Sequence, residues 1–337
     1  GHSMSHMKRI WYSSWFSGAG HIMQEASAQV FYENPWLNPE YVSKNPKLSR
    51  FGIEAQKAMK LWSSFDRGIP YTPFLILIGK SAGRWTVVEE PFGILKPNEA
   101  DLMINKFLDQ IYIGQSLGVG NEERYLCPSP YGDTFDVMIN DSNRSAWKSY
   151  PVIFTLGEIF WTKDDITALR EYVKQGGILV VNRLNLKGLE TLSPNIDHLL
   201  SVNNTVVYDT KKAVLGKTKL GKGTIFLSEN LDTIPGRAGY AYPKELLNAL
   251  FKAFIPFTIT GKVETLINRT PDGWAIMLIN NDGISKPLPY AEKEIIDTSK
   301  TQSVTISFSG NGAKVNEILG YSYKNINSNG KNYISTI

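Results

Sequence analysis

Short apolar runs alternate with longer stretches of helical periodicity between residues 72 and 254. The run Phe74–Ile78 is continuously apolar, which is typical of a strand buried on both faces of a parallel sheet. Further strands are predicted at residues 152–156, 177–181 and 222–227, and helices at residues 99–117, 163–175 and 243–254. This alternation predicts an α/β domain whose parallel sheet is covered by helices on both faces.

The residues before this domain have a different pattern. A helical stretch ends at Gly18-Ala19-Gly20, and a second helix is predicted at residues 49–65, where apolar residues recur at helical spacing. Gly68 and Pro70 follow this helix and are expected to end it. The seven residues at the start, GHSMSHM, are interpreted as an expression tag and are left out of the fold prediction.

After Pro256 the hydrophobic period changes from helical spacing to two. Residues 263–267 and 274–279 flank a turn at residues 270–273, Thr-Pro-Asp-Gly, and are predicted to form a hairpin. Short strands are also expected at residues 303–308, 313–319 and 332–336. The predicted parts are therefore a tag (1–7), a helix-strand-helix segment (8–71), an α/β domain (72–257) and a small antiparallel β-domain (258–337).

Composition excludes several classes of function. The chain has 337 residues, of which 20% are charged, and its net charge of +4 comes from no dense block of Lys and Arg, so no nucleic-acid partner is expected. Apolar runs stay shorter than the roughly 18 residues that span a membrane. Cys127 is the only cysteine, so neither an internal disulfide nor a cysteine-rich metal site can form, and we expect no cofactor or metal.

Two segments resemble a family of glycosidases. Residues 11–25, WYSSWFSGAGHIMQE, look like the seventh helix and eighth strand of the (β/α)8 barrel of the β-galactosidases that carry a trimerisation domain. Residues 150–157 and 169–180, with a helix ending at Gly176-Gly177, resemble the glutamine amidotransferase-like domain that follows this barrel. The resemblance implies a flavodoxin-like (class I glutamine amidotransferase-like) sheet, a small β-domain, a carbohydrate partner, homo-oligomers and a periplasmic or secreted location.

The resemblance also selects candidate site residues. It places Glu25 at the end of the eighth barrel strand, which faces the sugar pocket. Glycoside hydrolysis needs two carboxylates, and the family carries them on barrel strands four and seven, which have no counterpart here. We therefore expect an accessory or oligomerisation region without a complete catalytic pair. The candidates for carbohydrate contact are Trp11, Trp15, Glu25, Tyr131 and Asp133, since flat rings and carboxylates suit sugars.

Two motifs could supply a nucleophile instead. Cys127 lacks the Gly-x-Cys-x-Gly turn of an amidotransferase, and outside the tag only His21 and His198 could activate it. Gly79-Lys80-Ser81-Ala82-Gly83 is a G-x-S-x-G directly after a strand, but residues 84–88 read as extended where a nucleophile elbow needs a helix. A serine hydrolase using Ser81 is therefore less favoured than a free-standing carbohydrate-binding or assembly protein.

Aromatic residues predict self-association. Six rings in the N-terminal segment would normally be buried by a whole barrel, and we expect one α/β domain to leave several of them exposed. These rings belong to Trp11, Trp15, Phe16, Trp36, Trp62 and Phe65.

Overall fold

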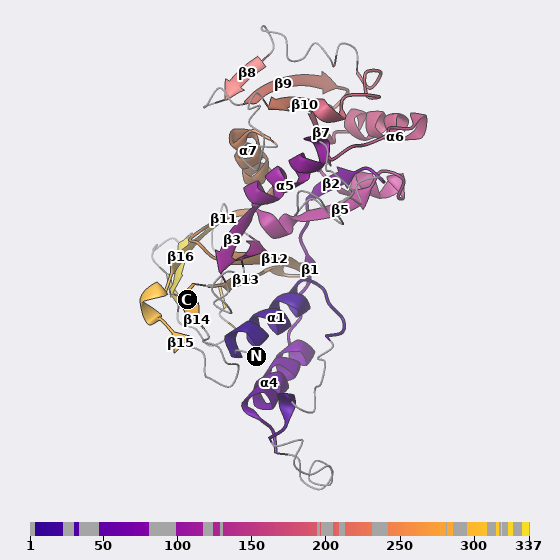
Figure 1. Cartoon of the computed structure of the whole chain (residues 1–337). Coiled ribbons are helices and arrows are strands. Elements are labelled where there is room, and N and C mark those ends of the chain that lie inside the picture. Colours follow the sequence, from indigo (N-terminus) through magenta and orange to yellow (C-terminus); the bar gives the residue numbers. More distant parts are fainter. Residues whose placement is uncertain are drawn as a thin grey trace, which may run out of the picture. The chain divides into compact units, whose positions relative to one another are not determined.

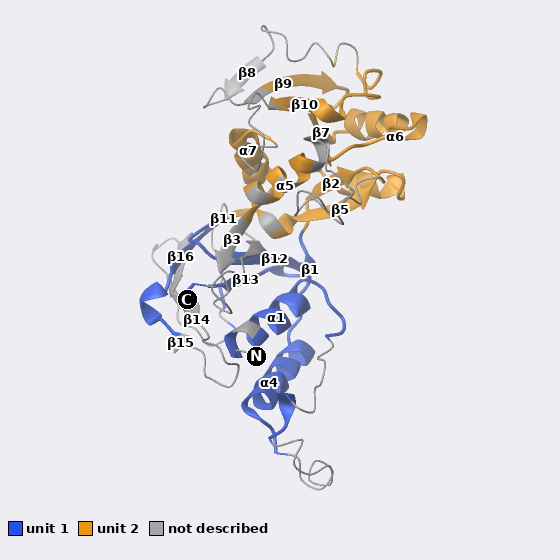
Figure 2. Ribbon diagram, in the orientation of Figure 1, with its two compact units in different colours: residues 1–71, 114–130, 259–337 blue, residues 72–113, 131–258 orange. Residues whose placement is uncertain are grey.

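The computed structural model describes residues 4–22, 30–33, 47–80, 99–116, 124–128, 131–193, 196, 205–208, 213–230, 242–280, 282–285, 295–308, 315–316, 318, 323–325 and 332–336. These residues divide into two compact units (Figure 2). Unit 1 comprises residues 1–71, 114–130 and 259–337, and unit 2 comprises residues 72–113 and 131–258.

Unit 2 is built on a sheet of seven strands (Figure 1). In spatial order these are β5 (Phe135–Ile139), β2 (Phe74–Ile78), β6 (Val152–Leu156), β7 (Ile178–Asn182), β10 (Gly223–Asn230), β9 (Ala213–Leu220) and β8 (Thr205–Tyr208). The first five run parallel, whereas β9 and β8 are antiparallel to their neighbours. The prediction of β2, β6 and β7 as central parallel strands is confirmed.

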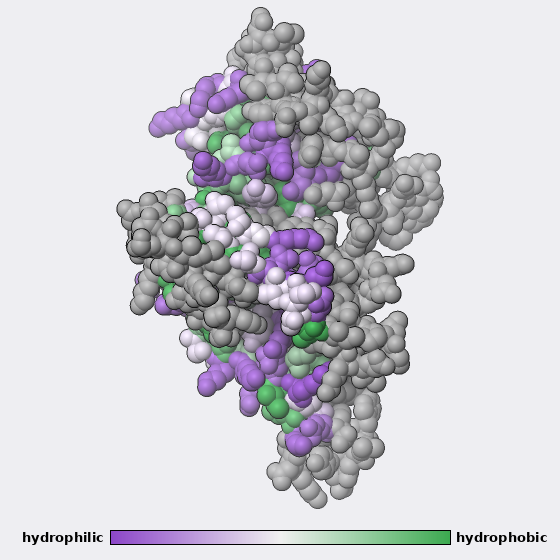
Figure 3. Space-filling model, turned by 90° about the vertical axis from the view of Figure 1, so that its left-hand side faces the viewer, coloured by the Kyte–Doolittle hydropathy of each residue, from purple (hydrophilic) through white to green (hydrophobic). Residues whose placement is uncertain are grey.

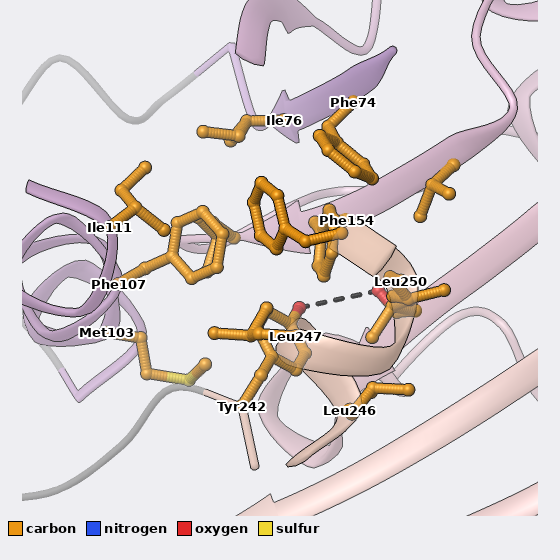
Figure 4. Close-up of a cluster of buried hydrophobic side chains, with 14 of the residues drawn as sticks. Phe74, Ile76, Met103, Phe107, Ile111, Phe154, Tyr242, Leu246, Leu247 and Leu250 are labelled. Carbon is orange, nitrogen blue, oxygen red and sulfur yellow. Dashed lines mark hydrogen bonds between the residues drawn. The ribbon is translucent and has the colours of Figure 1, made fainter. Parts of the chain in front are cut away.

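Apolar clusters fill both faces of this sheet. On one face, α5 (Glu99–Ile111) and α7 (Lys244–Phe254) bury residues including Phe107 and Leu250 against β2 and β6. Figure 4 shows the rings of Phe107 and Phe154 gathered beside Tyr242 in this cluster. On the other face, α6 (Lys163–Lys174) and the 3-10 helix η3 (Arg144–Ser149) pack over a second cluster. The predicted two-sided covering is confirmed.

Local signals explain where α6 begins and ends. The Thr162 hydroxyl accepts from Asp165 N–H and the Asp165 carboxylate accepts from Thr162 N–H, which makes a capping box. The helix ends before Gly176, whose φ of +123° lies in a region that favours glycine. Both signals stand in the sequence, so α6 lies where the pattern predicts it.

One helix prediction in unit 2 was wrong in detail, and two strands of the sheet were not predicted. The helix predicted at residues 99–117 ends at Ile111, and β3 (Tyr112–Ser116) follows and pairs with β4 (Arg124–Pro128). Gly114 disfavours continuation of the helix. We also missed β8 and β9, although Gly221, with a φ of +60°, begins a two-residue turn that joins β9 to β10.

Unit 1 includes the helices α1 (Met4–Phe16) and α4 (Arg50–Ser64) and a hairpin with an added edge strand. The sheet has the order β1 (Ile69–Pro70), β12 (Glu264–Thr270) and β13 (Gly273–Ile279). Thr270 pairs with Gly273, so the predicted turn and hairpin are confirmed. Met7, which we interpreted as the end of a tag, is buried in α1.

The remaining strands form two small antiparallel sheets. One has the order β11 (Phe257–Thr260), β16 (Ser303–Phe308), β18 (Asn332–Thr336) and β17 (Tyr323–Asn325), and the other joins β14 (Ile284–Ser285) to β15 (Ile295–Ile296). Most of the strand predicted at residues 313–319 lies outside the described residues. Further 3-10 helices in the described part of the chain include η2 (Gly132–Thr134), η4 (Arg183–Asn185) and η6 (Thr298–Lys300).

The expected exposure of the N-terminal rings was wrong. Trp11, Trp15 and Phe16 are buried, and the last two form a cluster with Leu266, Ala275 and Met277 of the hairpin. Trp62 and Phe65 pack against the same cluster, whereas Trp36 lies outside the described residues. Strands about 250 residues away in sequence cover Trp15 and Phe16, so these rings do not support the predicted self-association.

Candidate functional site

The candidate site in unit 2 lies at the carboxyl ends of β2 and β6. After β2 the chain continues to β5 on one side of it, whereas β6 lies on its other side. Ligands of doubly wound sheets bind outside the carboxyl ends of the strands at such a switch point. The loops that begin at Gly79 and Gly157 meet here.

These loops pack directly against each other. A Cβ atom on Gly79 would lie 1.9 Å from the carbonyl oxygen of Glu158, so the backbones approach as closely as glycine allows. Asn140, which follows β5, joins them: its Oδ1 accepts from Lys80 N–H at 3.2 Å, and its Nδ2 donates to the Phe160 carbonyl at 3.2 Å. The described parts of these loops therefore fill the place where a ligand would bind.

The Asp165 carboxylate anchors this arrangement. Its Oδ1 accepts from Arg144 Nε at 2.6 Å, and its Oδ2 accepts from Thr162 N–H at 2.9 Å and from Asn140 Nδ2 at 3.1 Å. Burial alone would raise the pKa of Asp165, but the hydrogen bonds from Thr162, Arg144 and Asn140 outweigh it and leave the pKa below its ordinary value. A carboxylate held ionised by three donors is a structural anion and is poorly suited to act as a general base near neutral pH.

A second buried network lies under the ends of β6 and β7. The Thr155 hydroxyl donates to Asn185 Oδ1 at 3.1 Å, and Trp161 Nε1 donates to the Asn185 carbonyl at 2.9 Å. Asn185 Nδ2 donates to the carbonyl of Gly157, and the Tyr242 hydroxyl donates to that of Thr155. Burial raises the pKa of Tyr242, so its hydroxyl stays protonated and donates. Each of these groups is used to hold the loops together.

The predicted site residues fall in different places. Trp11 and Trp15 belong to unit 1 and are only 3% and 6% exposed. Trp62 stacks on Trp15 with ring centroids 6.2 Å apart, and the Arg67 guanidinium lies 5.6 Å from the ring centroid of Trp15. A sugar could stack on these rings only if their faces were first uncovered.

Tyr131 and Asp133 lie close together in unit 2, at and just before η2. The Tyr131 hydroxyl donates to Asn248 Oδ1 at 2.9 Å, and its ring centroid lies 4.4 Å from that of Phe251. Tyr131 thus ties the start of β5 to α7. Asp133 acts on Tyr112: burial, and secondarily the charge of Asp133, raises the pKa of Tyr112 to about 12. Glu25, Ser81 and His198 lie outside the described residues.

The role of Tyr131 can be measured. Tyr131→Phe keeps the ring on Phe251 and removes the donor to Asn248, so we expect the free energy of unfolding to fall by about 0.5–1.5 kcal/mol. Urea denaturation followed by circular dichroism would measure this. A loss of carbohydrate binding at unchanged stability would instead favour the predicted sugar contact.

Sequence reasoning missed most of the polar network. The Thr162–Asp165 pair was visible as a helix cap, but no local motif marks Asn140, Arg144 or Asn185. Their partners are 20 to 60 positions away, so the signal exists only in the folded chain. The longest of these separations joins Asn140 to Lys80.

The outer face of α6 has a shallow hollow beside η3. It has a volume of about 380 Å³ and is lined by charges of both signs. Arg144 and Lys148 come from η3, and Asp164 and Glu171 come from α6. Within the described residues, no group of three or more His, Cys, Asp or Glu side chains is arranged to hold a metal ion. No described helix is long and apolar enough to cross a membrane.

Comparisons with known proteins give structural neighbours only. No protein-family model matches the chain, and no curated protein matches it in sequence. Among solved structures it is similar to a GH42 β-galactosidase from G. stearothermophilus (TM-score 0.39, 8% identity, 85% of this chain and 43% of that one). Others are a β-galactosidase from Bacillus circulans sp. alkalophilus (0.36, 10%, 77% and 39%) and a GH42 exo-carrageenase from Bacteroides ovatus (0.39, 12%, 86% and 33%).

The chain spans less than half the length of each of these neighbours. At such low identity and TM-score the likeness does not establish a shared activity.

Proposed function

We propose that this chain is an accessory region of a carbohydrate-active, glycoside hydrolase-like protein and has no complete catalytic apparatus of its own. The observation that supports this most is the filled edge of the parallel sheet. Gly79 packs on the Glu158 carbonyl, and the buried Asn140 and Asp165 are fully engaged in holding the loops. Groups used in this way stabilise a scaffold and offer no free acid, base or nucleophile.

The flavodoxin-like, amidotransferase-like assignment belongs to the same proposal. Numbered along the chain, the five parallel strands are arranged 2-1-3-4-5, the order of flavodoxin-like doubly wound sheets. A scaffold of this type suits a platform role. The carbohydrate part of the proposal rests on the sequence resemblance at residues 11–25, 150–157 and 169–180 and on the order of the predicted domains.

A glycosidase assay tests the proposal. We expect the purified chain to release no nitrophenol from nitrophenyl glycosides of galactose, glucose, mannose or fucose, because hydrolysis needs a pair of carboxylates at a defined separation. Turnover that is lost in Glu25→Gln would contradict the proposal, since it would reveal a catalytic partner for Glu25. An Asp272→Asn variant, altered in the exposed hairpin turn, serves as the matched control.

Two further assays separate the alternatives. Binding of galacto-oligosaccharides in calorimetry without any turnover would favour a free-standing carbohydrate-binding protein. Hydrolysis of a nitrophenyl ester that disappears in Ser81→Ala would favour a serine hydrolase. Neither result is expected of a scaffold that works only beside a catalytic domain.

A further inference from the structure

The edge strand β5 has unusual exposure for the end of a parallel sheet. β2 is its only neighbour among the described strands. Val137 is 59% exposed and Ile139 is 42% exposed, and both side chains lie on the same face because alternate residues of a strand share a face. On the face of the molecule drawn in Figure 3, by comparison, the hydrophobic residues that show are scattered among hydrophilic ones, as is usual for a protein surface.

The backbone of β5 also faces outward at these residues. Asn140 N–H donates to the Ile78 carbonyl of β2. Since the residues of a strand bond alternately to either side, Asp136 and Met138 bond toward β2, and Phe135, Val137 and Ile139 point their backbone groups away from the sheet. The Ile139 carbonyl is taken by Ser142 N–H. The other outward groups of these three residues have no partner within the described part of the chain.

β5 itself has none of the residues that usually protect a sheet edge. Its sequence, FDVMI, contains no Lys, Arg or Pro. Its one charged residue is Asp136. The Asp136 carboxylate accepts hydrogen bonds from the Thr72 hydroxyl at 2.7 Å and the Tyr150 hydroxyl at 2.8 Å, so its charge is not directed at the open edge. A strand with this composition is expected to pair with another strand.

We infer that β5 pairs antiparallel with the β5 of a second copy of this chain, on a two-fold axis through Val137. This register brings the outward-facing residues together: Val137 exchanges hydrogen bonds with its own counterpart, and Phe135 meets Ile139 of the other copy. Asp136 then faces Met138 of the other copy, so the two carboxylates do not oppose each other. The strand is thus complementary to itself in both backbone and side chains, and this argues for a second copy over an unrelated partner.

The inference specifies the platform role proposed above, but its test uses no carbohydrate. We expect sedimentation velocity at micromolar concentration to show a dimer. Val137→Lys places two like charges at the axis and should raise the dimer dissociation constant by about tenfold or more. Leu184→Lys, at a residue 43% exposed in the same unit, is the matched control and should leave the dimer unchanged.

A cross-linking experiment fixes the register. Hydrogen-bonded antiparallel residues have Cα atoms about 5.5 Å apart, within the roughly 4.4–6.8 Å of a disulfide. In a Cys127→Ala background, Val137→Cys should therefore form a disulfide-linked dimer under mild oxidation, and Leu184→Cys should not. A protein that stays monomeric in sedimentation velocity at 100 times that micromolar concentration would overturn the inference, whatever the glycosidase assay shows. An oligomer unaffected by Val137→Lys would overturn it as well.

Discussion

Arg9→Met is expected to lower the free energy of unfolding of unit 1 by about 3–5 kcal/mol, because it leaves a buried carboxylate without its guanidinium. Arg9 Nε and Nη2 donate to the two oxygens of Glu264 at 2.9 and 3.0 Å. The Glu264 side chain is 3% exposed and that of Arg9 17% exposed. The pair joins α1 to β12, so the loss should appear in both elements.

Hydrogen exchange measured by mass spectrometry can locate this effect. Amides of β12, β13 and α1 should exchange faster in Arg9→Met, while those of β6 and β7 in unit 2 keep their wild-type rates. The double variant Arg9→Met/Glu264→Met is the key control. Replacing both ions of a buried pair with apolar side chains is often neutral or stabilising, so most of the lost stability should return. A double variant as unstable as the single one would show that the pair is not the cause.

Short-range patterns account for the parts of the fold that were predicted. The continuous apolar run of β2, the Thr162–Asp165 cap of α6 and the turn before Gly273 each depend on residues within a few positions of one another. Propensity, capping and turn geometry act over that distance, so a single sequence displays them. The same reasoning could have found β9, since Gly221 marks its turn.

Long-range packing accounts for what was missed. The rings of Trp15 and Phe16 were expected to be exposed because no neighbouring pattern indicates what covers them, and the hairpin that does so lies about 250 residues away. Arg9 and Glu264 show the same separation. In the candidate site, Asn140 is an ordinary residue after a strand until the fold brings Lys80, Phe160 and Asp165 around it.

Asp165→Ala should destabilise unit 2 by about 3 kcal/mol. The loss of hydrogen bonds to a charged group costs about 1.5–3 kcal/mol, whereas the bond from the backbone N–H of residue 165 to the Thr162 hydroxyl remains. The side chain is fully buried, and its removal also leaves Asn140 Nδ2 with one acceptor fewer. Arg144 is partly exposed and can return to solvent, so it adds little to the penalty. Urea denaturation followed by circular dichroism would measure the change.

The same carboxylate predicts an acid-dependent loss of stability. The pKa of Asp165 is lower in the folded protein than its ordinary value, so the unfolded chain takes up the proton first. The stabilisation is therefore fully present above the unfolded pKa of about 3.9, and it is lost as the pH falls through the lower pKa of the folded state. Asp165→Asn, which cannot ionise, should be less stable than wild type at neutral pH, and the difference should shrink as the pH falls below about 4. A difference in unfolding free energy that stayed constant from pH 7 to pH 2 would show that the charge of Asp165 contributes nothing, and that only its shape and neutral hydrogen bonds hold the loops at the edge of the sheet.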